Sequence, residues 1–362
     1  MSVAPVRLAL VADSDVFGGA EAYLLHLLRH LPPRFAPVLL VTDPAPAQLL
    51  SGAAACGVPV VHVAPVRSKR DLRELVRLWR ALAATRADVV HVNQAIPANN
   101  RHAIALAAWQ RRAVVATLHL TARVESEQHG RRLRALYARL HRAIAVSQRT
   151  RAQLCDELGV APQRIEVVPN GVEVRAPTVP RDVPSGGALR IAALGRLVPQ
   201  KGFDVLVEAV RLLQRDGVRV EVRIAGDGAE RAALEAAAGD LAVHIVPFVD
   251  DPDAFLRDAD AFCLPSRDEG LPFALLEAMM LGLPCVATDV GDVAVALQDD
   301  AGVVVPPEDP GALAAALRGL WADPQRRRAL AAAARTRAVS VYSVDNMVAR
   351  TAAVYDEVLA GR

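Results

Sequence analysis

Short apolar runs rich in Val, Ile, Leu and Ala alternate with longer segments of helical periodicity along the whole chain. This alternation is typical of βαβ units, in which helices cover both faces of a buried parallel sheet. In the first half of the chain the pattern predicts helices such as 20–31 and 71–86, and strands near residues 6–13, 37–43, 58–63, 88–93, 113–119, 143–147 and 164–169. A second series of runs predicts strands near residues 190–195, 218–226, 243–249, 261–266, 284–289 and 302–305.

The periodicity stops between residues 172 and 187, where several prolines are followed by Ser185-Gly186-Gly187. Proline and glycine in such density indicate an interdomain linker. A chain of 362 residues also exceeds the usual size of one hydrophobic core. We therefore predict an α/β protein with two doubly wound, Rossmann-like domains facing each other across a cleft. Their predicted bounds are 1–175 and 188–341, with a linker at 176–187 and a C-terminal helical segment at 342–362 that packs back on the first domain.

Charge and cysteine usage narrow the class of protein. Lys and Arg total 42 and Asp and Glu total 40, a formal net charge of +2, so the overall charge does not favour a nucleic-acid partner. Residues 147–160 resemble the start of a helix-turn-helix, but they form one helix between buried strands, so DNA binding is not expected. No apolar run is long enough for a signal peptide or a membrane span, which predicts a cytoplasmic protein. The cysteines are far apart and fit reduced thiols without a structural zinc: Cys56, Cys155, Cys263 and Cys285.

A basic segment joins the first predicted strand of the second domain to the following helix. Arg196 and Lys201 lie in it, between Gly195 and Gly202. Open parallel sheets bind ligands at such turns, where the N-terminus of the helix presents unpaired N–H groups and a positive dipole. A guanidinium and an ammonium group suit the phosphates of a nucleotide there, and glycine lets the backbone approach them closely. The alternative is a solvated basic turn, because the segment is not a Walker loop.

Two carboxylates follow in the same domain. Glu269 lies in the predicted loop after the strand at 261–266, and Glu277 lies in the helix that Pro272 opens as its first residue. This helix is apolar almost all round, so we expect Glu277 to be buried and to need hydrogen-bond donors. The two hydroxyl groups of a ribose would supply them, and a structural salt bridge or a capping role is the alternative. Together with the cations, the carboxylates predict a pocket for a nucleotide diphosphate sugar.

Glycines and polar residues also follow strands of the first domain. Gly18 and Gly19 join its first strand to its first helix, where they would permit close approach of a ligand. This turn lacks the G-x-G-x-x-G fingerprint, which argues against a nicotinamide enzyme. Asn170 and Gly171 form a turn after the last strand of the domain.

Two histidines end predicted strands of the first domain. His119 ends the strand at 113–119, and His91 with Asn93 ends an earlier strand. The carboxyl ends of strands are where ligands bind in such sheets. A histidine at a strand end is often only a hydrogen-bonded edge residue, so the alternative for each is a structural role.

A basic amphipathic helix is predicted at residues 131–142. Leucines and a tyrosine alternate there with five arginines: Arg131, Arg132, Arg134, Arg139 and Arg142. A solvated surface helix is the ordinary explanation for such a pattern. Peripheral contact with an anionic membrane, or with an anionic acceptor, is the functional alternative.

The chain resembles the retaining glycosyltransferases of the GT-B fold known as glycosyl transferases group 1. The specific part of the resemblance lies in the second half, where family motifs occur in the expected order: G-R-L-x-x-x-K-G at 195–202, A-G-D-G at 225–228 and E-G-L-P-F-x-L-L-E-A-M at 269–279. This resemblance implies that Arg196 and Lys201 hold the donor diphosphate. It implies that Glu277 holds the ribose hydroxyls and that Glu269 holds the donor sugar. It also assigns backbone and side chains around the sugar, the base and the phosphates to substrate binding: Gly270, Leu271, Pro272, Phe273, Phe248, Val249 and Gly226.

The match is looser in the first half of the chain. The pair Gly18-Gly19 looks like the family's glycine-rich loop, His119 like its histidine near the reacting sugar, and Asn170 like the Asn of its Pro-Asn-Gly-Val turn. Two departures stand beside these matches. Leu120 follows the histidine where many members have Asp, and Asn93 stands where many have a second His. Both fall on the side of the family that shapes the acceptor, so the acceptor stays open.

The resemblance implies transfer of a sugar, with retention at the anomeric carbon, from a nucleotide diphosphate donor to a hydroxyl group. A UDP sugar is the favoured donor, and the acceptor is either a lipid-linked sugar in bacterial cell-envelope assembly or a small natural product. Arg196, Lys201, Glu269 and His119 are the catalytic candidates. We expect no cofactor and no essential metal, because we expect no Asp-x-Asp at a strand end and because the two cations can supply the charge of a divalent ion. The alternatives are a nucleotide-sugar epimerase on the same fold and a non-catalytic nucleotide-binding module.

Overall fold

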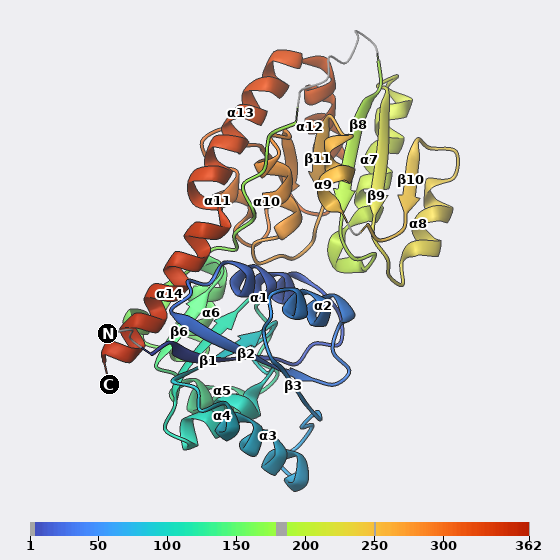
Figure 1. Cartoon of the computed structure of the whole chain (residues 1–362). Coiled ribbons are helices and arrows are strands. Elements are labelled where there is room, and N and C mark those ends of the chain that lie inside the picture. The colour runs from blue at the N-terminus through green and yellow to red at the C-terminus, as the bar shows by residue number, and fades with distance from the viewer. Residues whose placement is uncertain (1–3, 179–186, 250, 362) are drawn as a thin grey trace. The chain divides into compact units, whose positions relative to one another are not determined.

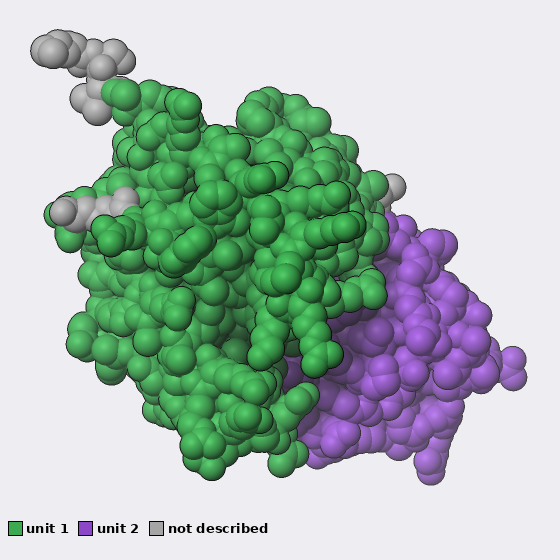
Figure 2. All heavy atoms as spheres, turned by 90° about the horizontal axis from the view of Figure 1, so that it is seen from below, with its two compact units in different colours: residues 1–171, 344–362 green, residues 172–343 purple. Residues whose placement is uncertain are grey.

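The chain divides into two compact units, which are coloured separately in Figure 2. Our computed structural model describes residues 4–178, 187–249 and 251–361. Unit 1 comprises Met1–Gly171 and Val344–Arg362, and unit 2 comprises Val172–Ser343. The predicted linker at 176–187 falls in unit 2, and its residues 179–186 lie outside the described residues. Before them, the backbone N–H of Thr178 donates to the carbonyl oxygen of Leu281 at 2.7 Å, which ties this segment to unit 2.

Unit 1 is built on one parallel sheet of seven strands in the order β3-β2-β1-β4-β5-β6-β7 (Figure 1). The order reverses at β1, which pairs with β2 on one side and with β4 on the other. Leu10 of β1 therefore lies opposite Leu39 and His91. The strands are β1 (Val6–Ala12), β2 (Phe35–Thr42), β3 (Val60–Val63), β4 (Val89–Gln94), β5 (Ala113–Leu118), β6 (Arg142–Ala145) and β7 (Ile165–Val167).

Helices cover both faces of this sheet. Helices α3 to α6 share one apolar core with the strands, which includes Leu78 of α3, Tyr137 of α5 and Val92 of β4. Helix α1 packs on α2 and on the C-terminal helix α14. The helical elements are α1 (Gly19–His30), α2 (Ala47–Ala55), α3 (Leu72–Thr85), α4 (Arg101–Trp109), α5 (Glu127–Tyr137), α6 (Gln148–Asp156), the 3₁₀ turn η1 (Pro162–Arg164) and α14 (Val344–Ala360).

Unit 2 repeats this plan with a parallel sheet of six strands in the order β10-β9-β8-β11-β12-β13 (Figure 1). The order reverses at β8, which pairs with β9 and β11. The strands are β8 (Leu189–Leu194), β9 (Val220–Ala225), β10 (Val243–Val246), β11 (Ala261–Leu264), β12 (Cys285–Thr288) and β13 (Val303–Val305).

Two apolar cores lie on the faces of this second sheet. One holds α7, α8 and α12, with Leu206 and Leu317 fully buried. The other holds α9, α10 and α11, with Leu275 and Val293 fully buried. The helical elements are the 3₁₀ turn η2 (Pro199–Lys201), α7 (Phe203–Arg215), α8 (Arg231–Ala238), α9 (Pro252–Arg257), α10 (Phe273–Met280), α11 (Val293–Ala296), α12 (Pro310–Ala322) and α13 (Pro324–Val341).

These sheets confirm the predicted fold class, and each predicted strand has a counterpart in them. The differences are at strand ends. The strand predicted at 243–249 ends at Val246, because the backbone N–H of Phe248 leaves the ladder and donates to Asp227 Oδ2 at 3.1 Å. Pro272 was predicted to be the first residue of a helix, but it precedes α10 as its N-cap with an extended ψ of 130°.

Helix α14 is tied to the sheet of unit 1 by buried hydrogen bonds. The hydroxyl group of Tyr355 lies 2.5 Å from Nδ1 of His91, whose Nε2 lies 2.7 Å from Thr117 Oγ1. The hydroxyl group of Tyr23 lies 3.1 Å from Thr351 Oγ1. Burial lowers the pKa of His91 to about 3, so its imidazole is neutral near pH 7. His91 therefore has a structural role in this fold.

The bond from Tyr355 to His91 predicts a stability effect. Tyr355→Phe removes the partner of a fully buried ring nitrogen, which we expect to lower the free energy of unfolding by about 1–3 kcal/mol. The next residue provides the control, since Asp356 forms an exposed ion pair with Arg34 at 2.8 Å and Asp356→Ala should cost about 0–1 kcal/mol. Urea unfolding of both variants measures the two values. Equal losses would contradict the assigned role of His91.

Candidate functional site

The predicted donor residues of unit 2 lie at the point where the strand order of its sheet reverses. Arg196 and Lys201 follow β8, and Glu269 follows β11, the neighbour of β8 on the far side of the reversal. Gly226 follows β9, the other neighbour of β8. In open parallel sheets, ligands bind beyond the carboxyl ends of strands at such a reversal. Residues that are far apart in the sequence thus meet at one edge of the sheet.

Glycines let these loops pack directly on each other. A Cβ atom on Gly202 would lie 2.1 Å from the carbonyl oxygen of Pro265, and one on Gly226 would lie 1.8 Å from the carbonyl oxygen of Gly195. Gly202 also has a φ of +62°, which favours glycine. The Nε2 of Gln200 donates to the carbonyl oxygen of Asp268 at 2.8 Å and adds a hydrogen bond between the loops. These glycines were predicted to approach a ligand, but in the structure they approach neighbouring backbone.

Lys201 and Glu269 form a partly buried ion pair across the two loops. The Nζ of Lys201 lies 2.6 Å from Oε1 of Glu269, and the same oxygen accepts a hydrogen bond from Ser266 Oγ at 2.7 Å. The side chains are only 16% and 6% exposed. Oε2 of Glu269 forms no hydrogen bond with any described residue. One carboxylate oxygen is therefore held by the protein, and the other is open to a ligand hydroxyl group.

Arg196 differs from Lys201 in its surroundings. Its side chain is exposed, and its contact with Gln200 Oε1 is 3.5 Å long, at the limit of a hydrogen bond. The guanidinium group therefore keeps most of its donors available for an anion. Of the two predicted phosphate ligands, Arg196 is the open cation, whereas Lys201 already has a carboxylate partner.

Glu277 lies on α10, where its side chain is half-buried and the charged groups of Arg175 and Asp253 act on its carboxyl group. Burial raises the pKa of this carboxyl group to about 7, although the charge of Arg175 lowers it. No described residue forms a hydrogen bond or ion pair with the Glu277 side chain. The predicted alternative of a structural salt bridge is therefore not found among the described residues. A desolvated carboxylate without a protein partner suits a ligand that brings its own hydroxyl donors.

The predicted base-binding residues lie in the loop after β10. Phe248 is 51% exposed, and Val249 is half-buried against the core. Arg231 organises this region, because its Nη2 donates to the carbonyl oxygen of Gly226 at 2.6 Å and to Asp227 Oδ1 at 2.7 Å. Our sequence analysis missed Arg231. Asp227 lies outside α8, which begins at Arg231, so no helical spacing in the sequence indicated this pair.

A further loop supports the segment from Gly270 to Phe273. The backbone N–H of Asp292 donates to the carbonyl oxygen of Gly270 at 2.9 Å. Gly291 has a φ of +58°, and a Cβ there would lie 2.2 Å from the carbonyl oxygen of Glu269. Leu271 is buried, which anchors the segment in the core. Sequence analysis also missed Gly291 and Asp292, whose contact depends on the pairing of β11 with β12.

His119 of unit 1 is neutral, and its neighbours define its tautomer. Its Nε2 lies 2.8 Å from Oδ1 of Asn93, whose Nδ2 donates to the carbonyl oxygen of Ala20 at 2.9 Å. Because the Asn93 oxygen must accept, Nε2 of His119 carries the proton and Nδ1 is left as an acceptor. Burial lowers the pKa of His119 to about 3. The ring of Tyr23 packs edge-on against His119, with centroids 5.1 Å apart. Asn93, which departs from the family pattern, thus orients this histidine.

The glycine pair of unit 1 begins α1. Gly18 is its N-cap and donates its N–H to Glu21 Oε2 at 2.9 Å. Its φ is −149°, in extended backbone that any residue adopts. The expectation that no Asp-x-Asp lies at a strand end is wrong, because Asp13-Ser14-Asp15 follows β1 directly. Oδ2 of Asp13 accepts the backbone N–H of Asn100 at 2.8 Å, across the reversal between β1 and β4. Hydrogen bonds within unit 1 thus engage Gly18 and Asp13, and Gly19 lies exposed beside them.

Two other predicted features of unit 1 have internal partners. Asn170 is buried in the turn after β7, and Gly171 donates its N–H to the sulfur of Met347 on α14. The basic helix predicted at 131–142 is wrong in extent, because α5 ends at Tyr137 and Arg142 begins β6. Arg142 is paired with Glu357 at 2.8 Å. Tyr137, the last residue of α5, is buried in the core.

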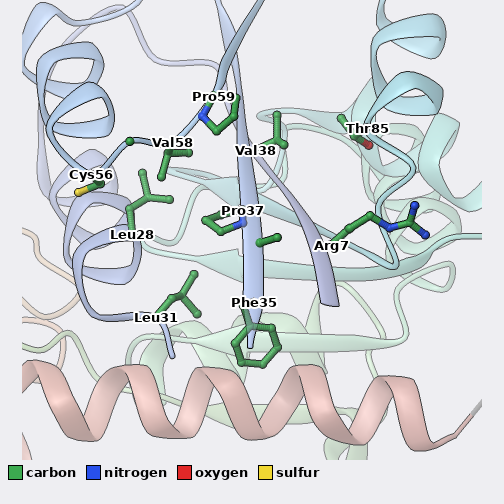
Figure 3. A pocket seen from close by; sticks show the side chains of 12 residues that line it. Arg7, Leu28, Leu31, Phe35, Pro37, Val38, Cys56, Val58, Pro59 and Thr85 are labelled. Carbon is green, nitrogen blue, oxygen red and sulfur yellow. The ribbon is translucent and has the colours of Figure 1, made fainter. Parts of the chain in front are cut away.

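A separate cavity of about 480 Å³ lies at the opposite edge of the same sheet, where β1 and β2 begin (Figure 3). Leu31, Phe35 and Val38 contribute apolar side chains to it. Arg7 reaches its rim, but its guanidinium group pairs with Asp88 at 3.2 Å. None of the predicted site residues line this cavity. It is therefore distinct from the candidate site, which lies at the carboxyl ends of the strands.

Comparisons with known proteins identify the family of this chain. The family described as glycosyl transferases group 1 matches residues 188–323, and glycosyltransferase family 4 matches residues 17–176. A phosphatidyl-myo-inositol mannosyltransferase of Mycolicibacterium smegmatis is 31% identical over 95% of this chain and 91% of its own. A glycogen synthase of Mycobacterium tuberculosis is 30% identical over 75% of this chain and 69% of its own.

Solved structures share the fold of this chain over nearly its whole length. Anabaena Alr3699/HepE in complex with UDP-glucose matches with a TM-score of 0.80 at 19% identity, covering 97% of this chain and 99% of its own. This likeness identifies the fold as GT-B, as predicted. Among the described residues, no helix is long and apolar enough to cross a membrane.

The raised pKa of Glu277 predicts a pH-dependent stability effect. Its folded-state pKa of about 7 exceeds the ordinary 4.5, so ionisation of the unfolded chain lowers stability as the pH rises from 4.5 to 7. We expect Glu277→Gln to unfold with a free energy about 2 kcal/mol above wild type at pH 8, and with no such gain at pH 4. Urea unfolding at both pH values measures this, with the exposed Glu235→Gln as control. A gain that does not depend on pH would contradict the assigned burial.

Proposed function

We propose a specific reaction for this chain, which belongs to the glycosyl transferases group 1 family and is a glycosyltransferase. It moves a sugar from a nucleotide diphosphate donor, with a UDP sugar as the favoured donor, to a hydroxyl acceptor. The observation that carries the proposal is the ion pair of Lys201 with Glu269 at the carboxyl ends of β8 and β11, with Arg196 in the loop after β8 and Glu277 on α10, which follows β11. Cations suit the diphosphate and carboxylates suit hydroxyl groups, as one donor molecule requires. The UDP-glucose bound by the neighbour from Anabaena supports this choice.

Each part of the donor has a proposed partner in unit 2. Arg196, with its open guanidinium group, contacts the diphosphate. Lys201 donates to the phosphate next to the sugar while it keeps its bond to Glu269, since an ammonium group has three donors. The free Oε2 of Glu269 accepts a sugar hydroxyl group. Glu277 accepts the ribose hydroxyl groups, and the exposed ring of Phe248 lies where a base can stack on it.

The backbone of the loops completes the proposed donor site. Gly270 to Phe273 precede and begin α10, so the N–H groups of Gly270, Leu271 and Phe273 lie at a helix N-terminus. Such groups favour an anionic or hydroxyl ligand. Pro272 and Leu271 hold this segment in the core, and Gly226 brings the loop after β9 against the loop after β8. These residues act by shaping the site rather than by chemistry.

We propose that the transfer retains the anomeric configuration, as the family resemblance implies. Lys201 and Ser266 both donate to the same oxygen of the Glu269 carboxylate, so that oxygen is held by the protein rather than free to attack the anomeric carbon. The favoured route is front-face attack, in which the acceptor oxygen bonds to the anomeric carbon as the bond to phosphate breaks. The departing phosphate takes the acceptor proton. Stabilising this leaving group is then the main task of the two cations.

His119 is assigned to the sugar on the family resemblance, and the structure limits what it can do there. Its neutral ring with an unprotonated Nδ1 can accept a hydroxyl hydrogen bond but cannot supply a positive charge near pH 7. Gly18, Gly19 and Asn170 are assigned to substrate binding on the same ground. The proposed acceptors are a lipid-linked sugar and a small natural product, and the named activity of the mycobacterial mannosyltransferase supports the first.

We further propose a cytoplasmic enzyme without a cofactor or an essential metal. Arg196 and Lys201 supply the positive charge that a divalent ion would place on the diphosphate. The Asp-x-Asp sequence after β1 could serve as a metal ligand, but Oδ2 of Asp13 already accepts the backbone N–H of Asn100. The proposal of membrane contact through Arg131 and Arg132 on α5 rests on their charge and exposure.

The reaction itself is tested by product analysis. With UDP sugars and a hydroxyl acceptor panel, we expect a glycoside whose anomeric carbon has the donor's configuration, as measured by NMR on the first product. EDTA should leave the rate unchanged. An inverted anomer would overturn the proposal of retention. Activity that is lost with EDTA and restored by magnesium or manganese would overturn the proposal that no metal is essential. Rapid conversion of donor alone to an epimer would indicate an epimerase, and donor binding without turnover would indicate a binding module.

The roles of the donor residues predict different kinetic losses. Charge forms on the diphosphate as its bond to the sugar breaks, so Arg196→Ala and Lys201→Ala should each lower kcat about tenfold to a hundredfold. Glu277→Ala should chiefly raise KM, because the ribose does not change charge. Glu269→Ala should fall between. Arg215→Ala is the matched control, since it removes an exposed arginine from the last turn of α7. Full turnover in both cation variants would contradict the placement of the diphosphate.

A further inference from the structure

Helix α3 of unit 1 carries an exposed apolar stripe. Leu72 is 67% exposed and Val76 is 45% exposed. With 100° per residue, these two side chains share one face with Trp79 and Ala83. The residues that α3 buries against the core, Leu78 and Leu82, point to a different face. The stripe is therefore additional to the apolar surface that the fold needs.

A tryptophan pair extends this stripe onto the next helix. Trp109, the last residue of α4, is 70% exposed, which is the largest exposed fraction among the large hydrophobic residues that the structure describes. Its ring lies 6.0 Å from that of Trp79, measured between centroids. The Nε2 of Gln110 donates to the carbonyl oxygen of Trp79 at 2.8 Å and fixes the two helices together at this point. We call Leu72, Val76, Trp79 and Trp109 the tryptophan face.

Free positive charge borders the tryptophan face. Residues 67–80 contain six Lys or Arg residues and two acidic residues. Glu74 is engaged by Arg77 at 2.9 Å, and Asp71 accepts backbone N–H groups before α3. Arg73 and Arg80 lie beside the stripe on its solvent side and form no hydrogen bond or ion pair with the described residues. The border is thus basic, with two cations unneutralised by the fold.

We propose that the tryptophan face docks unit 1 on an anionic lipid bilayer. An amphipathic helix with Trp and Leu on one side and arginine beside them lies in the interface of such a bilayer. Tryptophan is enriched at that depth because its ring is apolar and its N–H is polar. Arginine stems cover apolar surface while their heads reach the lipid phosphates. A protein partner would need an apolar patch with acidic residues around it. An anionic bilayer offers an apolar interior and negatively charged headgroups at every point of its surface.

This surface differs from the α5 arginines proposed above. On α5 the exposed residues include Arg131 and Arg132, but no exposed large hydrophobic residue of the described chain lies there. That helix can attract a charged surface without inserting. Helices α3, α4 and α5 lie together on the lower side of unit 1 in Figure 1, which Figure 2 views from below. The tryptophan face therefore supplies the inserting part, and α5 adds charge at most.

Tryptophan fluorescence gives a direct measurement. The chain has three tryptophans, and Trp321 of unit 2 donates its indole N–H to the carbonyl oxygen of Gly187. In Trp321→Phe, the two remaining reporters belong to the tryptophan face. With vesicles of phosphatidylcholine and phosphatidylglycerol we expect a blue shift of the emission maximum, and with pure phosphatidylcholine a much smaller one. No shift with anionic vesicles, together with no cosedimentation, would overturn the proposal.

Paired variants identify the surface that binds. Leu72→Gln/Val76→Gln should weaken cosedimentation with anionic vesicles about tenfold or more, because two apolar side chains no longer leave water. Val295→Gln/Val339→Gln, on exposed valines of unit 2, should leave it unchanged. Arg73→Gln/Arg80→Gln should weaken it and reduce its dependence on salt. Full binding in the leucine and valine variant would overturn the proposal.

Two further results separate the alternatives. If Arg131→Gln/Arg132→Gln abolishes binding while Leu72→Gln/Val76→Gln does not, the α5 surface is the membrane site and the tryptophan face is not. If Leu72→Gln/Val76→Gln instead converts a dimer to a monomer in sedimentation without lipid, a second copy of the chain covers the face, and the lipid proposal fails. Hydrolysis of a UDP sugar, measured in the same variants without lipid, reports the proposed activity separately. Absence of hydrolysis would contradict the proposed function alone, because vesicle binding is measured without a donor.

Discussion

The ion pair between Lys201 and Glu269 is the interaction on which the candidate site depends. It joins the loops after β8 and β11, the two strands on either side of the reversal in unit 2. A partly buried pair of this kind gains stability from each further hydrogen bond to its charged groups. Ser266 contributes on the carboxylate, and Gly202 permits the backbone contact that brings the loops together. One cation is thereby pre-oriented, and Arg196 is left open beside it.

Glu277 differs from Glu269, because no described residue forms an ion pair or a hydrogen bond with its side chain. Its carboxyl group is desolvated without a described partner, and burial raises its pKa to about 7. Such a group lowers stability near neutral pH unless a ligand donates to it. This is the physical ground for the proposal that Glu277 of the otherwise apolar α10 binds hydroxyl groups of the donor. In unit 1, Asn93 solves a related problem for His119, because its amide selects one tautomer of a ring that burial keeps neutral.

Unit 1 carries an exposed apolar surface that is separate from the proposed donor site. Unit 1 buries the apolar residues that its sheet needs and still exposes Leu72, Val76 and Trp109 beside unpaired arginines. Most exposed apolar residues occur singly and need no explanation, but a contiguous patch with a basic border does. An enzyme with a lipid-linked acceptor would gain from such a face, because docking confines enzyme and acceptor to the same surface.

The sequence by itself determined the strands, their alternation with helices and the motifs at 195–202 and 269–279, because hydrophobic period and turn chemistry are local properties. Strand order was decided only by the tertiary structure, since parallel strands pair across long crossovers. That order makes Lys201 a partner of Glu269. It also separates His91, locked to Tyr355 of α14, from His119, although both follow the same local pattern. Long-range packing decides which of two similar side chains keeps a free atom for a ligand.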